Sequence, residues 1–183
     1  MSVVAIQGVK GSYSEEAAWS LLGQDAEIVE CLDFAATFAA VATSQAEFAV
    51  VPVENKIVGE IADSVNLLRQ GDFRVHDRFP LRVKHVLAGT ADASVEGIET
   101  VRSHVEALKQ CRRFLGRYPE WRQIIGADTA SSIRRVVEGG LAENAAIGSR
   151  RAAQLYGAKI LAEGIADDID NWTTFFLIGR NAG

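Results

Sequence analysis

The 183-residue sequence has few of the residues from which metal sites and disulfide frameworks are built. It contains two cysteines, Cys31 and Cys111, far apart in the chain and outside any CxxC motif. None of its three histidines stands at metal-ligand spacing from another. We therefore expect two buried free thiols, no structural disulfide and no bound metal.

Long apolar runs and basic stretches are also missing. No apolar run approaches the roughly 20 residues that a membrane-spanning helix needs. The first residues, Met1–Ile6, lack a basic region followed by a long apolar stretch, so we expect no signal peptide, no membrane partner and a cytoplasmic location. The formal net charge of −5 argues against nucleic acid as a partner, because no cluster of Lys and Arg interleaved with aromatic residues offsets it.

The chain does have an ordinary globular composition, with 48% hydrophobic and 23% charged residues. Strand-like and helix-like segments alternate along it. Glu47–Val53 is a continuous apolar run, typical of a strand buried on both faces. Helical periodicity is found at 14–22, where Ser14 is a candidate N-cap, and at 34–41, where Asp33 is one. This alternation predicts βαβ units and parallel sheets.

Extended runs at 73–78 and 81–88, with Pro80 at their joint, indicate that the chain passes from one lobe to another. We predict an α/β fold of two Rossmann-like lobes with a cleft between them: residues 1–79 with 164–183, and residues 80–163. In such folds ligands bind beyond the carboxyl ends of strands, where backbone amides and helix N-termini point toward the ligand.

Candidate site residues gather in five loops at the predicted strand ends. The first loop has Gly11, Ser12, Tyr13 and Ser14, and the second has Glu54, Asn55, Lys56 and Gly59. The third has Ser103 and His104, and a helix predicted over 104–115 follows it and carries Gln110. The fourth has Thr129 and Ala130, and the fifth has Asn171, Thr173, Thr174 and Phe175. The alternative for each is structural, because loop residues shape turns and a histidine at a helix start more often caps or packs. No Ser/His/Asp arrangement emerges, so a reaction without a cofactor, based on hydrogen bonds and electrostatics, fits best.

Taken in order, these loops resemble the prephenate dehydratase family over nearly the whole chain. The segments that carry the resemblance are Gly8–Ala18, Val51–Asn55 with Gly59, Ser103-His104 with Gln110-Cys111, Asp128–Ala130, Ala145–Ile147 with Tyr156-Gly157, and Asn171–Thr173. Each segment alone is a weak signal, but six of them in the right order are specific.

The resemblance implies a type II periplasmic-binding-protein-like fold, usually in a homodimer. It implies a carbon-oxygen lyase of phenylalanine biosynthesis that needs no cofactor and converts the small anion prephenate to phenylpyruvate, with loss of water and carbon dioxide. The family's essential threonine falls on Thr173, whose hydroxyl would assist departure of the ring hydroxyl. Glu54, Asn55 and Gln110 fall on catalytic positions, and Ser103, Thr129 and the opening loop fall on substrate-binding ones.

The chain departs from the family at several of these positions. The family motif Asn-x-Thr-Arg-Phe has Thr174 in place of its arginine, a natural carboxylate clamp. Lys56 stands where Ser or Thr is usual, Lys10 stands at a proline-type position, and His104-Val105-Glu106 replaces the common His-Pro-Gln. Either one of the lysines now clamps prephenate, or the cleft accepts a related anionic ring acid or acyl conjugate of secondary metabolism.

Two further expectations concern regulation and function class. We expect no ACT domain, the phenylalanine-sensing domain into which family enzymes normally continue. A small-molecule binding protein without catalysis is the hypothesis of a different class, because two-lobed α/β clefts are also the architecture of solute-binding proteins. The expected lack of a signal peptide and the retention of Thr173 with Glu54 and Asn55 favour the enzyme.

Overall fold

The computed structural model describes residues 1–181, and the chain divides into two compact α/β units. Unit 1 comprises Met1–Val83 and the C-terminal segment that begins at Asp170, and unit 2 comprises Lys84–Ile169. Both crossings lie a few residues later than the predicted boundaries. The first is later because a strand of unit 1 continues to Arg82, where it pairs with Trp172 of the last strand. The predicted α/β class is confirmed, and the cleft between the units stays a prediction.

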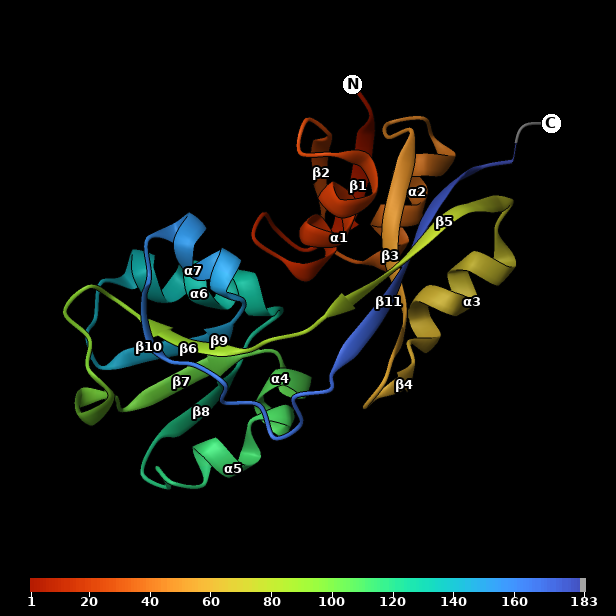
Figure 1. The fold of residues 1–183 in the computed structure, drawn as a ribbon. Helices are drawn as coiled ribbons and strands as arrows, with labels where there is room; N and C mark the ends of the chain where they lie inside the picture. The colour runs from red at the N-terminus through yellow and green to blue at the C-terminus, as the bar shows by residue number, and fades with distance from the viewer. Residues whose placement is uncertain (182–183) are drawn as a thin grey trace. The chain divides into compact units, whose positions relative to one another are not determined.

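Unit 1 is built on a mixed sheet with the strand order β2-β1-β3-β11-β5, in which β4 also pairs with β3 (Figure 1). Its elements are β1 (Val3–Gln7), α1 (Tyr13–Leu22), β2 (Glu27–Cys31), α2 (Phe34–Ala42), β3 (Phe48–Asn55), β4 (Gly59–Glu60), α3 (Ala62–Gln70), β5 (Phe73–Arg82) and β11 (Trp172–Arg180). β1 is parallel to β2 and β3, whereas β11 is antiparallel to β3 and β5. The predicted parallel pairing is thus confirmed for β1, β2 and β3 but is wrong for β11, which enters the sheet from unit 2 and not through a crossover helix of unit 1.

The two faces of this sheet pack against different helices, because successive strand residues point to opposite faces. Val4 and Ile6 of β1 lie in one apolar cluster with Ala17 of α1. Ala5, between them, lies in a second cluster with Phe38 of α2. β3 contributes to both clusters, as its continuous apolar sequence predicts.

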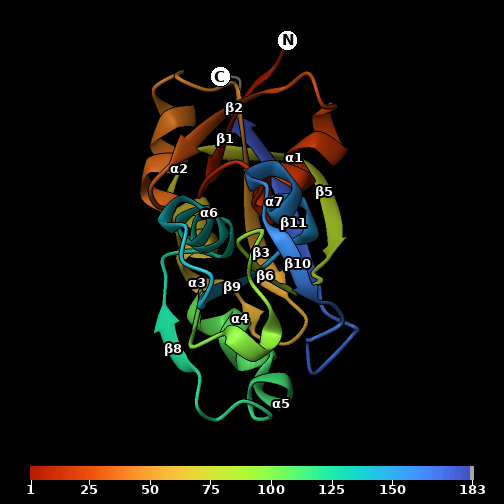
Figure 2. The same cartoon turned by 90° about the vertical axis from the view of Figure 1, so that its left-hand side faces the viewer.

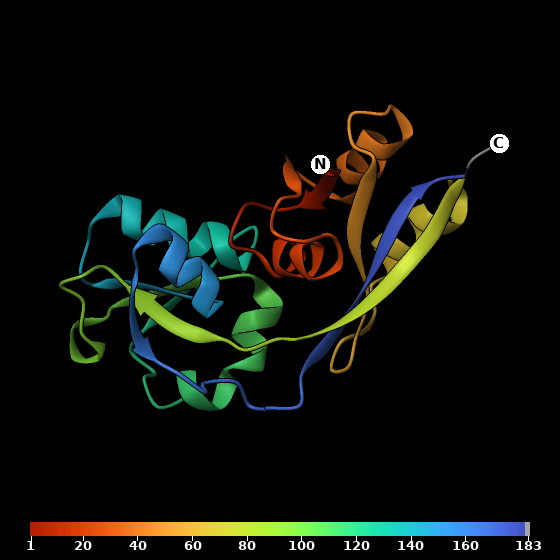
Figure 3. The same cartoon turned by 45° about the horizontal axis from the view of Figure 1, so that its top comes forward.

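β5 and β11 form a long antiparallel ribbon (Figure 3). Pro80 lies inside β5, opposite Thr174, and not at a joint between two strands as predicted. Proline has no N–H to donate and is tolerated on edge strands, and β5 is the edge strand of the described sheet. The link to unit 2 is residues 83–85, where the backbone amide of Val83 donates to the carbonyl of Asn171 at 2.8 Å.

Unit 2 is built on a second mixed sheet, in the order β10-β6-β9-β7-β8 (Figures 1 and 2). Its elements are β6 (Val86–Gly89), the 3-10 helix η1 (Val95–Gly97), β7 (Thr100–Ser103), α4 (Val105–Gln110), α5 (Arg112–Leu115), β8 (Arg122–Ile125), α6 (Thr129–Gly139), β9 (Asn144–Gly148), α7 (Arg150–Tyr156) and β10 (Lys159–Ala162). β7 is parallel to β8 and β9, whereas β6 is antiparallel to β9 and β10. The single helix predicted over 104–115 is instead two short helices that break at Cys111, whose amide donates to the carbonyl three residues back and tightens the last turn of α4.

The sequence predicts two N-caps, of which one is confirmed. Asp33 caps α2, and its carboxylate accepts a first-turn amide at 2.7 Å. α1 is capped by Ser12 and not by Ser14. The Ser12 hydroxyl accepts from the Glu15 amide at 3.3 Å, and the Glu15 carboxylate accepts from the Gly11 amide at 2.6 Å. This Ser-x-x-Glu spacing is the capping-box signature, which outcompetes the single hydroxyl of Ser14.

Candidate active site

In unit 1, several strand ends meet at one edge of the sheet. The carboxyl ends of parallel β1, β2 and β3 lie at this edge, and antiparallel β11 begins there. The edge therefore brings together residues 8–12 after β1, Asn55 at the end of β3 and Thr173 near the start of β11. The carboxyl ends of parallel strands are the usual ligand-binding edge of α/β sheets.

The side chains of Asn55, Asn171 and Thr173 form a buried hydrogen-bonded network. Asn55 Nδ2 donates to Asn171 Oδ1 and to Thr173 Oγ1, each at 2.8 Å. Asn55 Oδ1 accepts from the backbone amides of Ile57 at 2.9 Å and Val58 at 3.0 Å. A side-chain amide offers two N–H donors and two acceptor lone pairs, so Asn55 is fully occupied in holding the turn, Asn171 and Thr173.

A β-bulge in β3 places Asn55 on the same face of the sheet as Thr173. The pairing of β3 with β11 shifts between Thr174 and Phe175, which leaves Val53 as an extra residue on β3. A bulge changes the face to which the following side chains point. Thr173 shares its face with Phe175, which packs in the cluster beneath α1. Strict alternation along β3 would have put Asn55 on the other face.

Glu54 and Thr174 lie directly opposite each other, on the other face from Thr173. Glu54 is exposed and also pairs across the strands with Glu60 of β4. Opposite residues on neighbouring antiparallel strands have side chains in contact range. An arginine at position 174 would therefore lie beside the Glu54 carboxylate, which offers an alternative to the carboxylate-clamp interpretation of this position.

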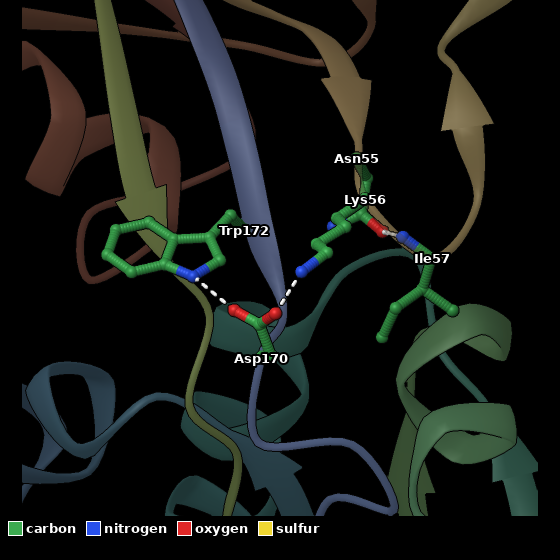
Figure 4. A network of polar contacts seen from close by, with 5 residues as sticks. All are labelled: Asn55, Lys56, Ile57, Asp170 and Trp172. Atoms are coloured by element: carbon green, nitrogen blue, oxygen red, sulfur yellow. Dashed lines mark hydrogen bonds and ion pairs between the residues drawn. The ribbon is translucent and has the colours of Figure 1, made fainter.

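Lys56, next to Asn55, forms an ion pair with Asp170 (Figure 4). The Asp170 carboxylate also accepts from the indole N–H of Trp172 at 2.9 Å (Figure 4). The hydrogen bonds from Lys56 and then from Trp172 lower the pKa of Asp170 below its ordinary value, so the carboxylate is charged at neutral pH. Lys56 thus has a carboxylate partner within the chain, which weakens the prediction that it clamps a substrate carboxylate.

The predicted binding residues of the opening loop lie at the start of α1. Gly11 has a φ of +89°, a conformation that favours glycine. Ser12 is the N-cap, and Tyr13 and Ser14 are the first two residues of the helix. Lys10 is exposed, and its backbone amide donates to an acidic side chain of β2 at 2.7 Å. The positive end of the helix dipole makes this segment suitable for an anion.

In unit 2, the carboxyl ends of β7, β8 and β9 also meet at one edge. Ser103 ends β7, and its buried hydroxyl donates to a backbone carbonyl of β9 at 2.7 Å. His104 is the N-cap of α4, with Nδ1 accepting an amide of that helix at 3.3 Å, which is the structural alternative considered for it. Thr129 and Ala130 begin α6, whose N-cap is Asp128.

Gln110, the last residue of α4, is joined to His85, a residue that the sequence analysis missed. The Oε1 atom of Gln110 lies 2.8 Å from Nε2 of His85, which is buried. Burial lowers the pKa of His85, and the hydrogen bond to Gln110 opposes this shift, so the imidazole is neutral at neutral pH. A histidine directly before the apolar run Val86–Gly89 was the available signal, since an ionisable group beside a buried strand needs a partner.

Two predicted binding residues serve the fold. Phe175 is 2% exposed and packs in the core of unit 1, so its ring is part of that core. Gly59 has a φ of +89° at the turn between β3 and β4.

The two cysteines are buried and free, and burial raises the pKa of both thiols, that of Cys111 to about 12. Neither thiol is thus a nucleophile at neutral pH.

Two searches of the described part of the chain gave negative results. Among residues 1–181, no group of three or more His, Cys, Asp or Glu side chains is placed to hold a metal ion. Within the same residues, no helix is both long enough and apolar enough to cross a membrane.

A family model described as prephenate dehydratase matches residues 4–183. The chain belongs to this family. It is 35% identical over 177 residues to "Arogenate dehydratase/prephenate dehydratase 2, chloroplastic" from Arabidopsis thaliana, a match that covers 97% of this chain and 46% of that protein. The chain spans about half the length of the curated relatives it matches, here 46% and 47% of two of them.

Two solved structures are similar over nearly the whole chain. The crystal structure of prephenate dehydratase from Arthrobacter aurescens in complex with L-Phe has a TM-score of 0.90 and 25% identity, and the match covers 99% of this chain and 61% of that one. A structure described as "GqqA- a novel type of quorum quenching acylases" has a TM-score of 0.86 and 29% identity, with 99% of this chain and 65% of that chain covered.

Proposed function

We propose that this chain is the catalytic domain of a prephenate dehydratase-type lyase, which converts prephenate to phenylpyruvate, water and carbon dioxide. The observation that carries the proposal is the buried Thr173 hydroxyl, at the ligand-binding edge of the unit 1 sheet and hydrogen-bonded to Asn55. Membership of the prephenate dehydratase family supports the substrate class.

Thr173 would act on the ring hydroxyl that leaves. Its Oγ1 accepts from Asn55 Nδ2, so its own hydrogen is directed to another acceptor. Donated to the leaving oxygen, this hydrogen bond stabilises the negative charge that develops as the C–O bond breaks. The ring carboxylate departs as carbon dioxide, its C–C electron pair completes the aromatic ring, and the released hydroxide takes up a proton to give water.

Asn55 would act on Thr173 and not on the substrate, because its donors and acceptors are already bound within unit 1. Glu54, which lies on the other face of β3, is kept as a catalytic residue on the family resemblance alone. Gln110 is likewise kept as a catalytic residue on the family resemblance alone. The start of α1 is proposed to receive a substrate carboxylate, since helix N-termini favour anions. Thr129 and Ala130, at the start of α6, are kept as substrate-binding residues on the family resemblance.

The test is turnover of purified protein with prephenate, followed by the absorbance of phenylpyruvate. Arogenate, which carries an amino group in place of the keto group of prephenate, is the second substrate, because a relative is named for both activities. Its product would be phenylalanine. Binding of either compound without turnover would instead make the chain a small-molecule binding protein, and neither binding nor turnover would end the proposal.

A second candidate function is cleavage of an acyl conjugate, in secondary metabolism. The similar structure described as a quorum quenching acylase favours it. Ile57, Val58 and Trp172 are large apolar side chains that are exposed near Lys56, where they would suit an acyl chain. Release of free amine from an N-acyl amide, in the absence of prephenate or arogenate turnover, would support this function over the first.

We also propose that the protein is a cytoplasmic homodimer, on the strength of the family resemblance. Sedimentation at two protein concentrations tests the dimer, and fractionation of cells tests the location. A monomer at high concentration would contradict the first proposal.

A further inference from the structure

β8 is an edge strand of the unit 2 sheet, because it pairs with β7 and stands at the end of the strand order (Figure 1). The amides of Arg122 and Gly126 donate to carbonyls in or next to β7, each at 2.8 Å. Successive residues of a parallel strand bond to opposite sides. The N–H and C=O groups of Gln123 and Ile125 therefore point away from β7.

This outer side of β8 is open. Among residues 1–181, no other segment bonds to the outward backbone groups of Gln123 and Ile125. Unpaired groups in a row along an edge strand are a template for pairing with another extended segment. An extended peptide at this edge would exchange backbone hydrogen bonds with both residues.

A hollow of about 460 Å³ lies beside this edge, lined by residues of α4, α5 and β8. Leu108, Leu115 and Trp121 line it, and each is at most 6% exposed, so they form an apolar floor. Gln123 and Ile125 also line it, because alternate residues of a strand face the same side. A hollow of this volume is within the usual range of binding sites.

The rim of the hollow is basic, although the chain as a whole is acidic. Residues 105–125 include five basic and two acidic residues, whereas the chain has a net charge of −5. Lys109 and Arg112 line the hollow and are exposed. Lys109 forms an ion pair with Glu106 at 2.9 Å, whereas Arg112 has no side-chain partner in the described part of the chain. A carboxylate at this rim would pair with Arg112.

We propose that β8 and the hollow beside it, together the β8 groove, bind an extended acidic segment of another protein, which adds a strand to the sheet. Its backbone pairs with Gln123 and Ile125, an apolar side chain enters the hollow, and a carboxylate binds Arg112. Backbone pairing of this kind provides affinity, and pockets for alternate side chains provide specificity.

Nucleic acid and a second copy of the chain fit the β8 groove less well. Tyr118 and Trp121 stack on each other, with ring centroids 4.0 Å apart and planes 5° apart, and Trp121 is buried. These rings are therefore poorly placed to stack on bases. Pairing of β8 with its own copy would place two basic rims side by side, and like charges repel. The basic rim thus favours an acidic partner.

The first test uses a short peptide of alternating Glu and Val residues with blocked ends. In NMR titrations of nitrogen-15-labelled protein, we expect the amide signals of Gln123 and Ile125 to shift and the affinity to fall as salt is added. A peptide with Lys in place of Glu is the matched control and should bind roughly 10-fold more weakly. No binding, equal binding of the two peptides, or shifts confined to other residues would overturn the proposal.

Two pairs of variants separate the charge from the strand edge. Arg112→Glu should weaken binding of the Glu-Val peptide roughly 5-fold, whereas Arg74→Glu, at an exposed position of β5, should not change it. Ile125→Pro removes an outward N–H and leaves the β7 ladder intact, so it should bind roughly 5-fold more weakly than Ile125→Ala. Equal affinities within either pair would overturn the proposal, and circular dichroism checks the fold of each variant.

A peptide methylated on its backbone nitrogens tests strand addition on the wild-type protein, in case the proline variant does not fold. This peptide has lost its donors, so we expect no binding, and binding as tight as that of the unmethylated peptide would overturn the proposal.

Sedimentation and titration with single-stranded oligothymidine test the other occupants. A dimer that dissociates in Ile125→Pro would assign the edge to a second copy, and oligothymidine that binds more tightly than the Glu-Val peptide would assign it to nucleic acid. Either result would overturn the proposal, whereas a groove that binds only the acidic peptide supports it. None of these measurements uses turnover, so they test the β8 groove independently of the proposed function.

Discussion

Asn55 and Lys56 are neighbours in the chain, and both bind residues in the short segment 170–173 where β11 begins, yet their contacts differ in burial and charge. Asn55 is 7% exposed and makes four neutral hydrogen bonds. Lys56 and Asp170 form an ion pair whose side chains are 56% and 57% exposed. A buried polar group that loses its partner keeps its full desolvation penalty, whereas an exposed ion pair competes with water and salt.

The hydrogen bonds of Asn55 fix the geometry of Thr173, whereas the ion pair of Lys56 with Asp170 does not contact Thr173. The buried neutral network directs the threonine hydroxyl, so we expect changes within it to lower activity. The Lys56 charge is compensated by Asp170 and by solvent, so we expect a substitution there to be tolerated.

The largest effect is expected at Thr173. Thr173→Val keeps the shape but removes the hydroxyl, and kcat with prephenate should fall by roughly 10²–10⁴, the range for assistance by a positioned side chain. Thr173→Ser, which keeps a hydroxyl, should retain measurable turnover. Circular dichroism of both variants checks that the fold is unchanged, and wild-type activity in Thr173→Val would remove the hydroxyl from the mechanism.

Asn55→Ala should lower both stability and activity. The substitution leaves the amides of Ile57 and Val58 without their acceptor, and we expect the free energy of unfolding to fall by about 1–3 kcal/mol in urea titrations. Thr173 also loses its donor, so kcat should fall at temperatures where the variant is fully folded. A loss of stability with unchanged kcat would restrict Asn55 to a structural role.

Thr174→Arg tests the face that Glu54 and residue 174 share. An arginine opposite Glu54 should raise the free energy of unfolding by roughly 0.2–1 kcal/mol, the usual range for a cross-strand pair of opposite charges. The gain should vanish in a Glu54→Gln background. A large fall in KM for prephenate with no change in stability would instead favour the carboxylate-clamp interpretation.

The smallest effect is expected at the exposed ion pair. Lys56→Gln should leave the melting temperature and kcat/KM unchanged within error, because the pair is solvated and screened by salt. A clear rise in KM for prephenate, larger at low ionic strength, would show that Lys56 binds a substrate carboxylate after all.

Much of the fold could be predicted from local patterns. The alternation of strands and helices, the helix predicted over 34–41 and the buried strand predicted at Glu47–Val53 correspond to elements of the structure, α2 and β3, and the Asp33 cap is present. What could not be predicted depends on pairing between distant segments. Local sequence does not show that β11 is antiparallel to β3, or that Pro80 lies on an edge strand where its missing N–H is tolerated.

In the candidate site, too, the contacts between distant segments could not be predicted from local sequence. Asn55 and Thr173 are recognisable from their motifs, but their contact depends on a bulge that alternation along β3 does not reveal. His85 lies outside every motif and has only its place directly before an apolar run as a signal, so its contact with Gln110 becomes visible in the fold alone. The predicted binding role of Phe175 came from its place next to the motif, whereas the strand directs its ring into the core.

The central claim is that Asn55 acts through the hydroxyl of Thr173. The most direct measurement is kcat/KM for prephenate of Asn55→Ala, Thr173→Val and the double variant, under conditions where all three are folded. Residues that act through one group show non-additive losses. The account predicts that the double variant is no slower than Thr173→Val alone. Losses that multiply in the double variant would contradict it, because Asn55 would then act on the substrate or on another group.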